Sequence, residues 1–117
     1  MKKIYHLANC TTCQRIINEL QLEAHDFKFQ EIKTQAITAD QLDALKDKVG
    51  SYEALFSRRA MKYRGMGLHE KNLTEKDYRK YILEDYTFLK RPVILIDDEI
   101  FVGNTKKVIA AAADKLK

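Results

Sequence analysis

Both cysteines of the chain, Cys10 and Cys13, are two residues apart at the boundary between two periodicities of the sequence. Residues 2–8 alternate loosely between polar and apolar side chains, which predicts a short strand. Residues 11–23 repeat apolar side chains three and four positions apart, which is typical of a helix with one apolar face. A Cys-x-x-Cys pair at a strand-to-helix junction is typical of a thiol redox motif.

The predicted helix leads into a second alternating segment. The members of its apolar face are Cys13, Ile16, Ile17, Leu20 and Ala24. Residues 25–32 then alternate, with Phe27 and Phe29 on one side and Gln30 and Ile32 on the other. This pattern predicts a second strand, and it should be parallel to the first because a helix connects the two.

The middle of the chain predicts helices only. Thr38, followed three residues later by Gln41, is a capping-box pattern, and Gly50 is a stop signal for the same helix. Residues 51–67 predict one or two short helices, and Thr74 begins another.

The last part of the chain predicts a hairpin and a helix. Val93–Ile96 is an apolar strand, the turn lies near Asp97–Asp98, and the second strand covers about residues 100–102. The final helix begins at a cap provided by Asn104 or Thr105. A strand–helix–strand half followed by a hairpin–helix half is the thioredoxin-like arrangement of an α/β protein.

These elements predict a single domain with an insertion. The thioredoxin-like core would comprise about residues 1–37 and 88–117, and about residues 38–87 would form a helical subdomain inserted between the two halves. A length of 117 residues is enough for one core, and 45% apolar with 32% charged residues is ordinary for a globular domain.

Composition also suggests a compartment. No apolar run approaches the roughly 20 residues that span a bilayer, and the apolar run near the start is too short for a signal peptide. We therefore expect a cytoplasmic protein that binds neither a membrane nor, directly, nucleic acid. The net charge of +4 is compatible with an anionic substrate or an acidic partner, but it is also common in proteins that bind neither.

The cysteine pair has three conceivable roles. A zinc site needs about four ligands, and the other candidates are His6, His25 and His69, of which the last two lie in unrelated segments without ligand spacing. A permanent disulfide is rare in the reducing cytosol. A reactive thiol is the remaining role, and we expect no metal.

The helix start makes the two cysteines unequal. Cys10 would precede the helix, where free N–H groups and the positive end of the dipole favour a thiolate. Cys13 would lie one turn further, close enough to resolve a mixed disulfide at Cys10. It also belongs to the apolar face, so it could instead be a small core residue.

Two further features are less specific. Pro92 directly precedes an apolar strand, a position that proline tolerates. The segment SRRAMKYR, residues 57–64, contains four cations and no acid. Arginine suits oxyanion binding because its planar fork matches the anion and keeps its charge. By pattern alone, however, a solvated basic helix face is the more common explanation.

Three segments together resemble the glutaredoxin-like arsenate reductase family, which includes Spx-type transcriptional regulators. They are YHLANCTTC near the start, ALFSRRAMKYRGMGL in the middle and FLKRPVILIDDEIFVGN near the end. The resemblance covers essentially the whole chain and implies a thioredoxin-like sheet of the glutaredoxin type with a helical insertion. In such folds the proline matching Pro92 is cis.

The resemblance implies roles for individual residues. Family arsenate reductases attack arsenate with a cysteine that matches Cys10, and His6 matches a histidine near the thiol. The implied anion site comprises Arg91, Arg59, Thr11, Thr12 and Pro92. A third family arginine should lie after the hairpin, but residues 102–104 are Val-Gly-Asn, which weakens the case for arsenate.

The two branches of the family imply different partners. Reductases use glutathione as co-substrate together with glutaredoxin or thioredoxin, and no bound cofactor. In Spx the Cys-x-x-Cys pair forms a regulatory disulfide, and the protein contacts the C-terminal domain of the RNA polymerase α subunit. Three hypotheses follow: a thiol reductase, a redox-sensing regulator, or a fold whose cysteines have no specific chemistry.

Overall fold

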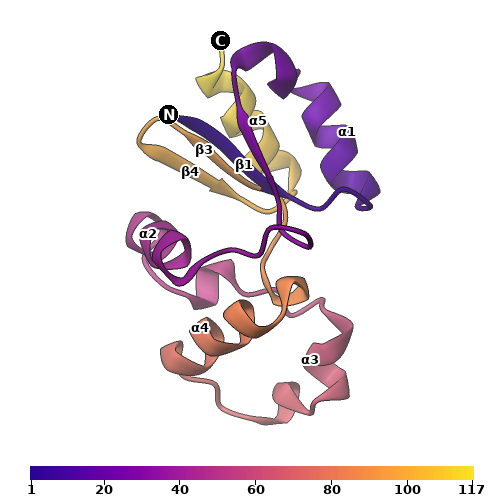
Figure 1. The fold of residues 1–117 in the computed structure, drawn as a ribbon, viewed down its shortest axis with the longest axis vertical. Helices are drawn as coiled ribbons and strands as arrows, with labels where there is room; N and C mark the ends of the chain where they lie inside the picture. The colour runs from indigo at the N-terminus through magenta and orange to yellow at the C-terminus, as the bar shows by residue number, and fades with distance from the viewer. The chain divides into compact units, whose positions relative to one another are not determined.

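The computed structural model describes all 117 residues, and the chain divides into two compact units. The first unit comprises Met1–Gln35 and Arg91–Lys117, and the second comprises Ala36–Lys90 (Figure 1). None of the helices combines the length and the apolar character needed to cross a membrane.

The first unit is a four-stranded mixed sheet with two α-helices and one short 3₁₀-helix. Its elements are β1 (Lys2–His6), α1 (Thr11–Glu19), η1 (Leu22–His25), β2 (Lys28–Glu31), β3 (Val93–Ile96), β4 (Glu99–Val102) and α5 (Lys106–Lys115). The strand order is β2-β1-β3-β4, in which β1 is parallel to β2 and β3 is antiparallel to both neighbours. The predicted strand–helix–strand and hairpin–helix halves are both present, so the predicted thioredoxin-like class is confirmed.

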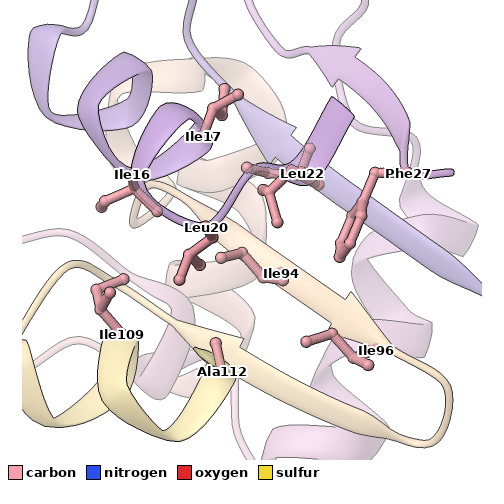
Figure 2. Packing of buried hydrophobic residues seen from close by; sticks show 10 residues of the cluster. Ile16, Ile17, Leu20, Leu22, Phe27, Ile94, Ile96, Ile109 and Ala112 are labelled. Atoms are coloured by element: carbon pink, nitrogen blue, oxygen red, sulfur yellow. The ribbon is translucent and has the colours of Figure 1, made fainter. Parts of the chain in front are cut away.

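One apolar cluster holds this unit together. Helices α1 and α5 cover the same face of the sheet, because their side chains meet those of the strands in a single cluster (Figure 2). Ile16 and Ile109 contribute from the helices and Ile94 from β3, one of the two central strands. Burial of an apolar side chain of this size contributes about 1.5–3 kcal/mol, so the cluster fixes α1 firmly on the sheet.

The first helix ends earlier than the sequence pattern predicts. It stops at Glu19, Gln21 adopts a left-handed backbone with φ of 52°, and the 3₁₀-helix η1 follows. In a continuous helix Leu22 would lie about 200° around the axis from Leu20, away from the core. The break lets Leu22 become fully buried, and it leaves Ala24 exposed, so the assignment of Ala24 to the apolar face was wrong.

The hairpin and last helix agree with their predicted signals. Asp97 makes the turn with φ of 55°, a left-handed conformation that aspartate tolerates better than most residues. The Thr105 side chain caps α5 by accepting a hydrogen bond from the backbone N–H of Val108 at 3.2 Å. Of the two predicted caps, Thr105 is therefore the correct one.

The second unit contains helices and one isolated antiparallel β-bridge, between Phe56 and Leu89. It contains α2 (Ala39–Val49), η2 (Glu53–Leu55), α3 (Met61–Gly65), η3 (Leu68–Glu70), α4 (Glu75–Glu84) and η4 (Tyr86–Phe88). The capping box of Thr38 and Gln41 is present, and Thr74 forms a second one with Asp77. Gly50 ends α2 with φ of 103°, and its N–H bonds to the Lys46 carbonyl at 2.7 Å.

Aromatic side chains form the centre of this unit. The Phe56 ring stacks on Phe88 with centroids 5.2 Å apart and lies 4.8 Å from the Tyr78 ring. Both phenylalanines are at most 1% exposed.

On the surface of the unit, the Arg79 guanidinium binds the Asp43 carboxylate through two hydrogen bonds of 2.9 and 3.1 Å.

Candidate functional site

Cys10 occupies the N-cap position of α1. Its backbone is extended, with φ of −93° and ψ of 110°, and its carbonyl accepts the first helical hydrogen bond, from Gln14. Its N–H bonds to the Leu7 carbonyl at 3.1 Å, which closes the short turn between β1 and α1. The sulfur makes no conventional cap hydrogen bond, and both cysteines are free thiols.

The surroundings of Cys10 favour its charged form. Burial alone raises the pKa of the Cys10 thiol, but the backbone N–H groups of Cys13 and Thr12, the Cys13 thiol and the charge of Arg91 outweigh burial. The pKa therefore lies below the usual value of a cysteine. Such N–H groups are available because the first turn of a helix contains no acceptors for them. A thiolate in this position is nucleophilic near neutral pH.

Cys13 has the opposite character. It is 0% exposed and belongs to the apolar side of α1, whereas Cys10 is half-buried. Burial raises the pKa of the Cys13 thiol to about 12; the backbone of Leu7 opposes this, and the hydrogen bond with Cys10 and its charge add to it. Cys13 therefore stays protonated in the range where Cys10 ionises.

Arg91 and Pro92 directly precede β3, and the charge of Arg91 acts on the cysteines at the start of α1. The peptide bond between them is cis, as the family resemblance implies. The Pro92 carbonyl accepts a hydrogen bond from the Gly103 N–H at 2.9 Å, which joins the segment before β3 to the end of the hairpin. The charge of Arg91 lowers the pKa of both thiols, so its guanidinium contributes a positive potential at the site.

The segment after β4, where the resemblance implies a third arginine, contains a glycine with an unusual backbone conformation. Gly103 has φ of 91°, a conformation that side-chain-bearing residues rarely adopt. An arginine at this residue would be strained even though space for a Cβ atom is open. Residue 103 is therefore suited to glycine and not to an arginine.

His6 lies on β1, four residues before Cys10. The residue is only 9% exposed, its Nδ1 has no hydrogen-bond partner, and its ring forms a T-shaped contact with the Phe29 ring, with the centroids 5.7 Å apart. Burial lowers the pKa of His6, and the nearby Glu31 carboxylate opposes this in part. The imidazole is therefore neutral at neutral pH, and its role beside the thiol stays a prediction.

The remaining predicted residues have mixed surroundings. Thr11 is exposed and Thr12 half-buried in the first turn of α1. Arg59 belongs to the second unit, where it is exposed and forms no ion pair, while its neighbour Arg58 pairs with Glu53 at 2.6 Å. The structure thus brings Cys10, Cys13, Thr12 and Arg91 together in the first unit, and anion binding by Arg59 stays a prediction.

Two further observations concern the chemistry available at this site. No group of three His, Cys, Asp or Glu side chains has the arrangement of a metal site. Sequence reasoning missed Glu31, whose carboxylate accepts a hydrogen bond from the Ala8 N–H in the turn before Cys10, at 2.9 Å. Its only sequence signal is an acid at the end of a strand, which is too common to be informative.

The sheet, the helix start and the paired free thiols define a thioredoxin-like protein with a Cys-x-x-Cys motif at the N-terminus of its first helix. The model of the ArsC family matches residues 5–112, and the chain belongs to this family.

Known proteins similar to this chain include both branches of the family. The global transcriptional regulator Spx 2 of Bacillus anthracis is 23% identical over 105 residues, which are 88% of this chain and 79% of that protein. An arsenate reductase (ArsC) related protein from Brucella melitensis is 25% identical with a TM-score of 0.73, covering 94% of this chain and 92% of that one. The arsenate reductase from Vibrio cholerae is 14% identical with a TM-score of 0.79, covering 94% and 95%, and it supports the fold alone.

Proposed function

We propose that this protein is a cytoplasmic thiol-dependent oxidoreductase in which Cys10 is the attacking nucleophile. The observation that carries the proposal is the asymmetry of the two thiols at the start of α1: Cys10 is half-buried with a lowered pKa, and Cys13 is fully buried with a pKa near 12. A pair of equivalent thiols would not favour one direction of attack. A reducing cytosol would return the pair to the dithiol form.

The first candidate substrate is a glutathione-linked disulfide. The Cys10 thiolate would attack one sulfur, form a mixed disulfide and release the other sulfur as a thiolate. Loss of the Cys10 charge would then remove two influences that raise the pKa of Cys13. Cys13 would attack the Cys10 sulfur, release the second thiol and leave a Cys10–Cys13 disulfide. Alternatively, an external glutathione would attack the substrate-derived sulfur, form a new glutathione-linked disulfide and release the Cys10 thiolate. In both routes two electrons pass from the attacking thiols to the original disulfide.

The second candidate substrate is arsenate, which the resemblance to family reductases suggests. Cys10 would displace water from the arsenic and form a thiol ester. A second thiol would then attack the Cys10 sulfur, so that two electrons pass to arsenic and arsenite leaves. Arg91 would bind the anion, the free N–H groups at the start of α1 would add to its stabilisation, and His6 would lie near the thiol. The absence of an arginine at residues 102–104 removes one of the anion-binding side chains that the resemblance implies, which favours the disulfide over arsenate.

Mutation of the nucleophile tests the mechanism. Reduction of arsenate and of a glutathionylated peptide would be measured for the native chain, Cys10→Ser and Cys13→Ser, each with glutathione and glutaredoxin. We expect Cys10→Ser to abolish turnover of both substrates. Turnover retained in Cys10→Ser would exclude the mechanism. Loss in Cys13→Ser as well would identify Cys13 as the resolving thiol, and its retention would identify glutathione.

A redox-sensing regulator is the second candidate, and the similarity to Spx 2 over most of the chain supports it. Here the Cys10–Cys13 disulfide would be the signal and the C-terminal domain of the RNA polymerase α subunit the partner. A binding assay with that domain, run with the oxidised and the reduced chain, tests this alternative. Absence of binding in both states would exclude it.

A further inference from the structure

Glu31, the last residue of β2, connects two segments that are far apart in the sequence. One oxygen of its carboxylate, Oε2, accepts the backbone N–H of Ala8 at 2.9 Å. The other, Oε1, accepts the N–H groups of Lys33 and Thr34 at 3.1 and 2.8 Å and the Thr34 hydroxyl at 3.0 Å. One side chain therefore fixes its own turn with one oxygen and the turn before Cys10 with the other.

Hydrogen bonds hold the turn from Leu7 to Cys10 at its start, at its end and between them, in addition to the contact of the Leu7 backbone with the Cys13 thiol. At its start, the sheet pairs His6 with Glu31, and the His6 carbonyl accepts the Ile32 N–H at 2.9 Å. At its end, the Cys10 N–H bonds to the Leu7 carbonyl at 3.1 Å. Between them, the exposed residues Ala8 and Asn9 carry only one such attachment, the hydrogen bond from Ala8 to Glu31.

The position of this turn determines where the Cys10 sulfur lies. Cys10 ends the turn and is also the N-cap of α1, so a shift of the turn moves the sulfur relative to the N–H groups of Thr12 and Cys13. Hydrogen bonds and partial charges at a helix start weaken steeply with distance and angle. A hydrogen bond that fixes the turn therefore also fixes the position of the Cys10 sulfur.

We propose that Glu31 is a positioning residue for Cys10: its carboxylate holds Ala8 and thereby keeps the sulfur at the N–H groups that start α1. The inference rests on the proposed function insofar as it assigns a purpose to the low-pKa thiol. The Ala8 N–H and, opposed by burial, the groups of Thr34 and Lys33 hold the pKa of Glu31 below its usual range, so the carboxylate is charged near neutral pH.

Alkylation of Cys10 by iodoacetamide measures its thiolate directly and needs no substrate. Rates between pH 5 and 9.5 would be recorded for the reduced native chain and Glu31→Ala, with the labelled cysteine identified by peptide mass. We expect the midpoint of the pH profile to move toward that of a free cysteine in Glu31→Ala. The rate at pH 7 would then fall by roughly three- to tenfold, since one pKa unit changes the thiolate fraction up to tenfold.

Thr34→Val is the matched control. It removes the hydroxyl bonded to Oε1 and leaves the Ala8 bond to Oε2 in place, so its profile should coincide with that of the native chain. If Glu31→Ala does not fold, as judged by circular dichroism, the nearly isosteric Glu31→Gln replaces it, because one amide oxygen cannot accept from both turns. We then expect a fall of at least about twofold.

The sign of the change separates positioning from charge. Removing a carboxylate that acted only as a nearby negative charge would ease ionisation of Cys10 and speed alkylation. An unchanged or faster rate in the Glu31 variants would therefore overturn the proposal. A failure of the proposed function would appear separately, as absence of substrate turnover in a chain whose Cys10 still alkylates rapidly.

Discussion

Helices α1 and α2 begin with the same spacing of side chains but with different chemistry. In α2 the N-cap Thr38 and the third helical residue Gln41 form a capping box, in which each side chain bonds to the other residue's backbone at 3.0 to 3.1 Å. In α1 the same two positions are Cys10 and Cys13, and no conventional cap bond forms. The two cysteines of the Cys-x-x-Cys motif thus occupy the two positions that a capping box would use.

The comparison shows what a helix start can be used for. A capping box satisfies free N–H groups of the first turn and contributes about 1 kcal/mol to stability. At the start of α1 the N–H groups of Thr12 and Cys13 instead favour the charged form of the Cys10 thiol. The same geometry that brings Gln41 to Thr38 brings the Cys13 thiol to Cys10. The first-turn N–H groups therefore stabilise the helix in α2, whereas in α1 they make a thiol more reactive.

The largest predicted effect concerns Cys13 at alkaline pH. Its folded pKa of about 12 lies above the ordinary value of 9.0, so the unfolded chain loses this proton first. The free energy of unfolding should therefore fall between about pH 9 and pH 12, with a contribution from Cys13 approaching about 1.4 kcal/mol per pH unit. Urea unfolding under reducing conditions at pH 8.5 and 10.5 measures this fall.

Cys13→Ala is the control for this pH dependence of the free energy of unfolding. The cavity left by the missing sulfur should lower the free energy of unfolding at both pH values. The decrease from the lower to the higher pH should be smaller than in the native chain, because only the remaining titrating groups contribute. An equal decline in the variant and the native chain would show that burial does not hold the Cys13 proton.

Substitutions at the two N-cap residues, Cys10 and Thr38, test the comparison through stability. Cys10→Ser places a good N-cap residue at the start of α1 and should raise the free energy of unfolding by about 0.5–1 kcal/mol at pH 6. Thr38→Ala removes the cap of α2 and should lower it by about 1 kcal/mol, while Thr38→Ser should have little effect. Urea unfolding of the three variants measures both changes. Destabilisation by Cys10→Ser equal to that by Thr38→Ala would mean that Cys10 already acts as a structural cap.

Local signals account for most of what the sequence predicted correctly. The capping box of Thr38 and Gln41, the stop at Gly50 and the hairpin turn at Asp97 each involve residues within four positions of one another. The end of α1 was predicted wrongly because burial of Leu22 decides it, and the Leu22 side chain packs against distant parts of the first unit. A helical pattern alone cannot contain that information.

The same distinction applies to the site. The place of Cys10 before a helix follows from adjacent residues, and so could be predicted. The link between Glu31 and Ala8 depends on the register that pairs His6 with Glu31 across two strands, and neither residue type signals it. The unpartnered Nδ1 of His6 is likewise a result of packing.

The smallest predicted effect separates the helix start from its side-chain surroundings. Arg91→Ala removes a positive charge that favours the Cys10 thiolate, and the rate of alkylation by the uncharged reagent iodoacetamide at pH 7 should fall about two- to fivefold. Arg91→Lys keeps the charge and should retain most of the rate, and added salt should narrow the difference because it screens the charge. An unchanged rate in Arg91→Ala would mean that the N–H groups of α1 suffice to lower the pKa. The contrast between α1 and α2 would then reduce to the identity of the capping atom.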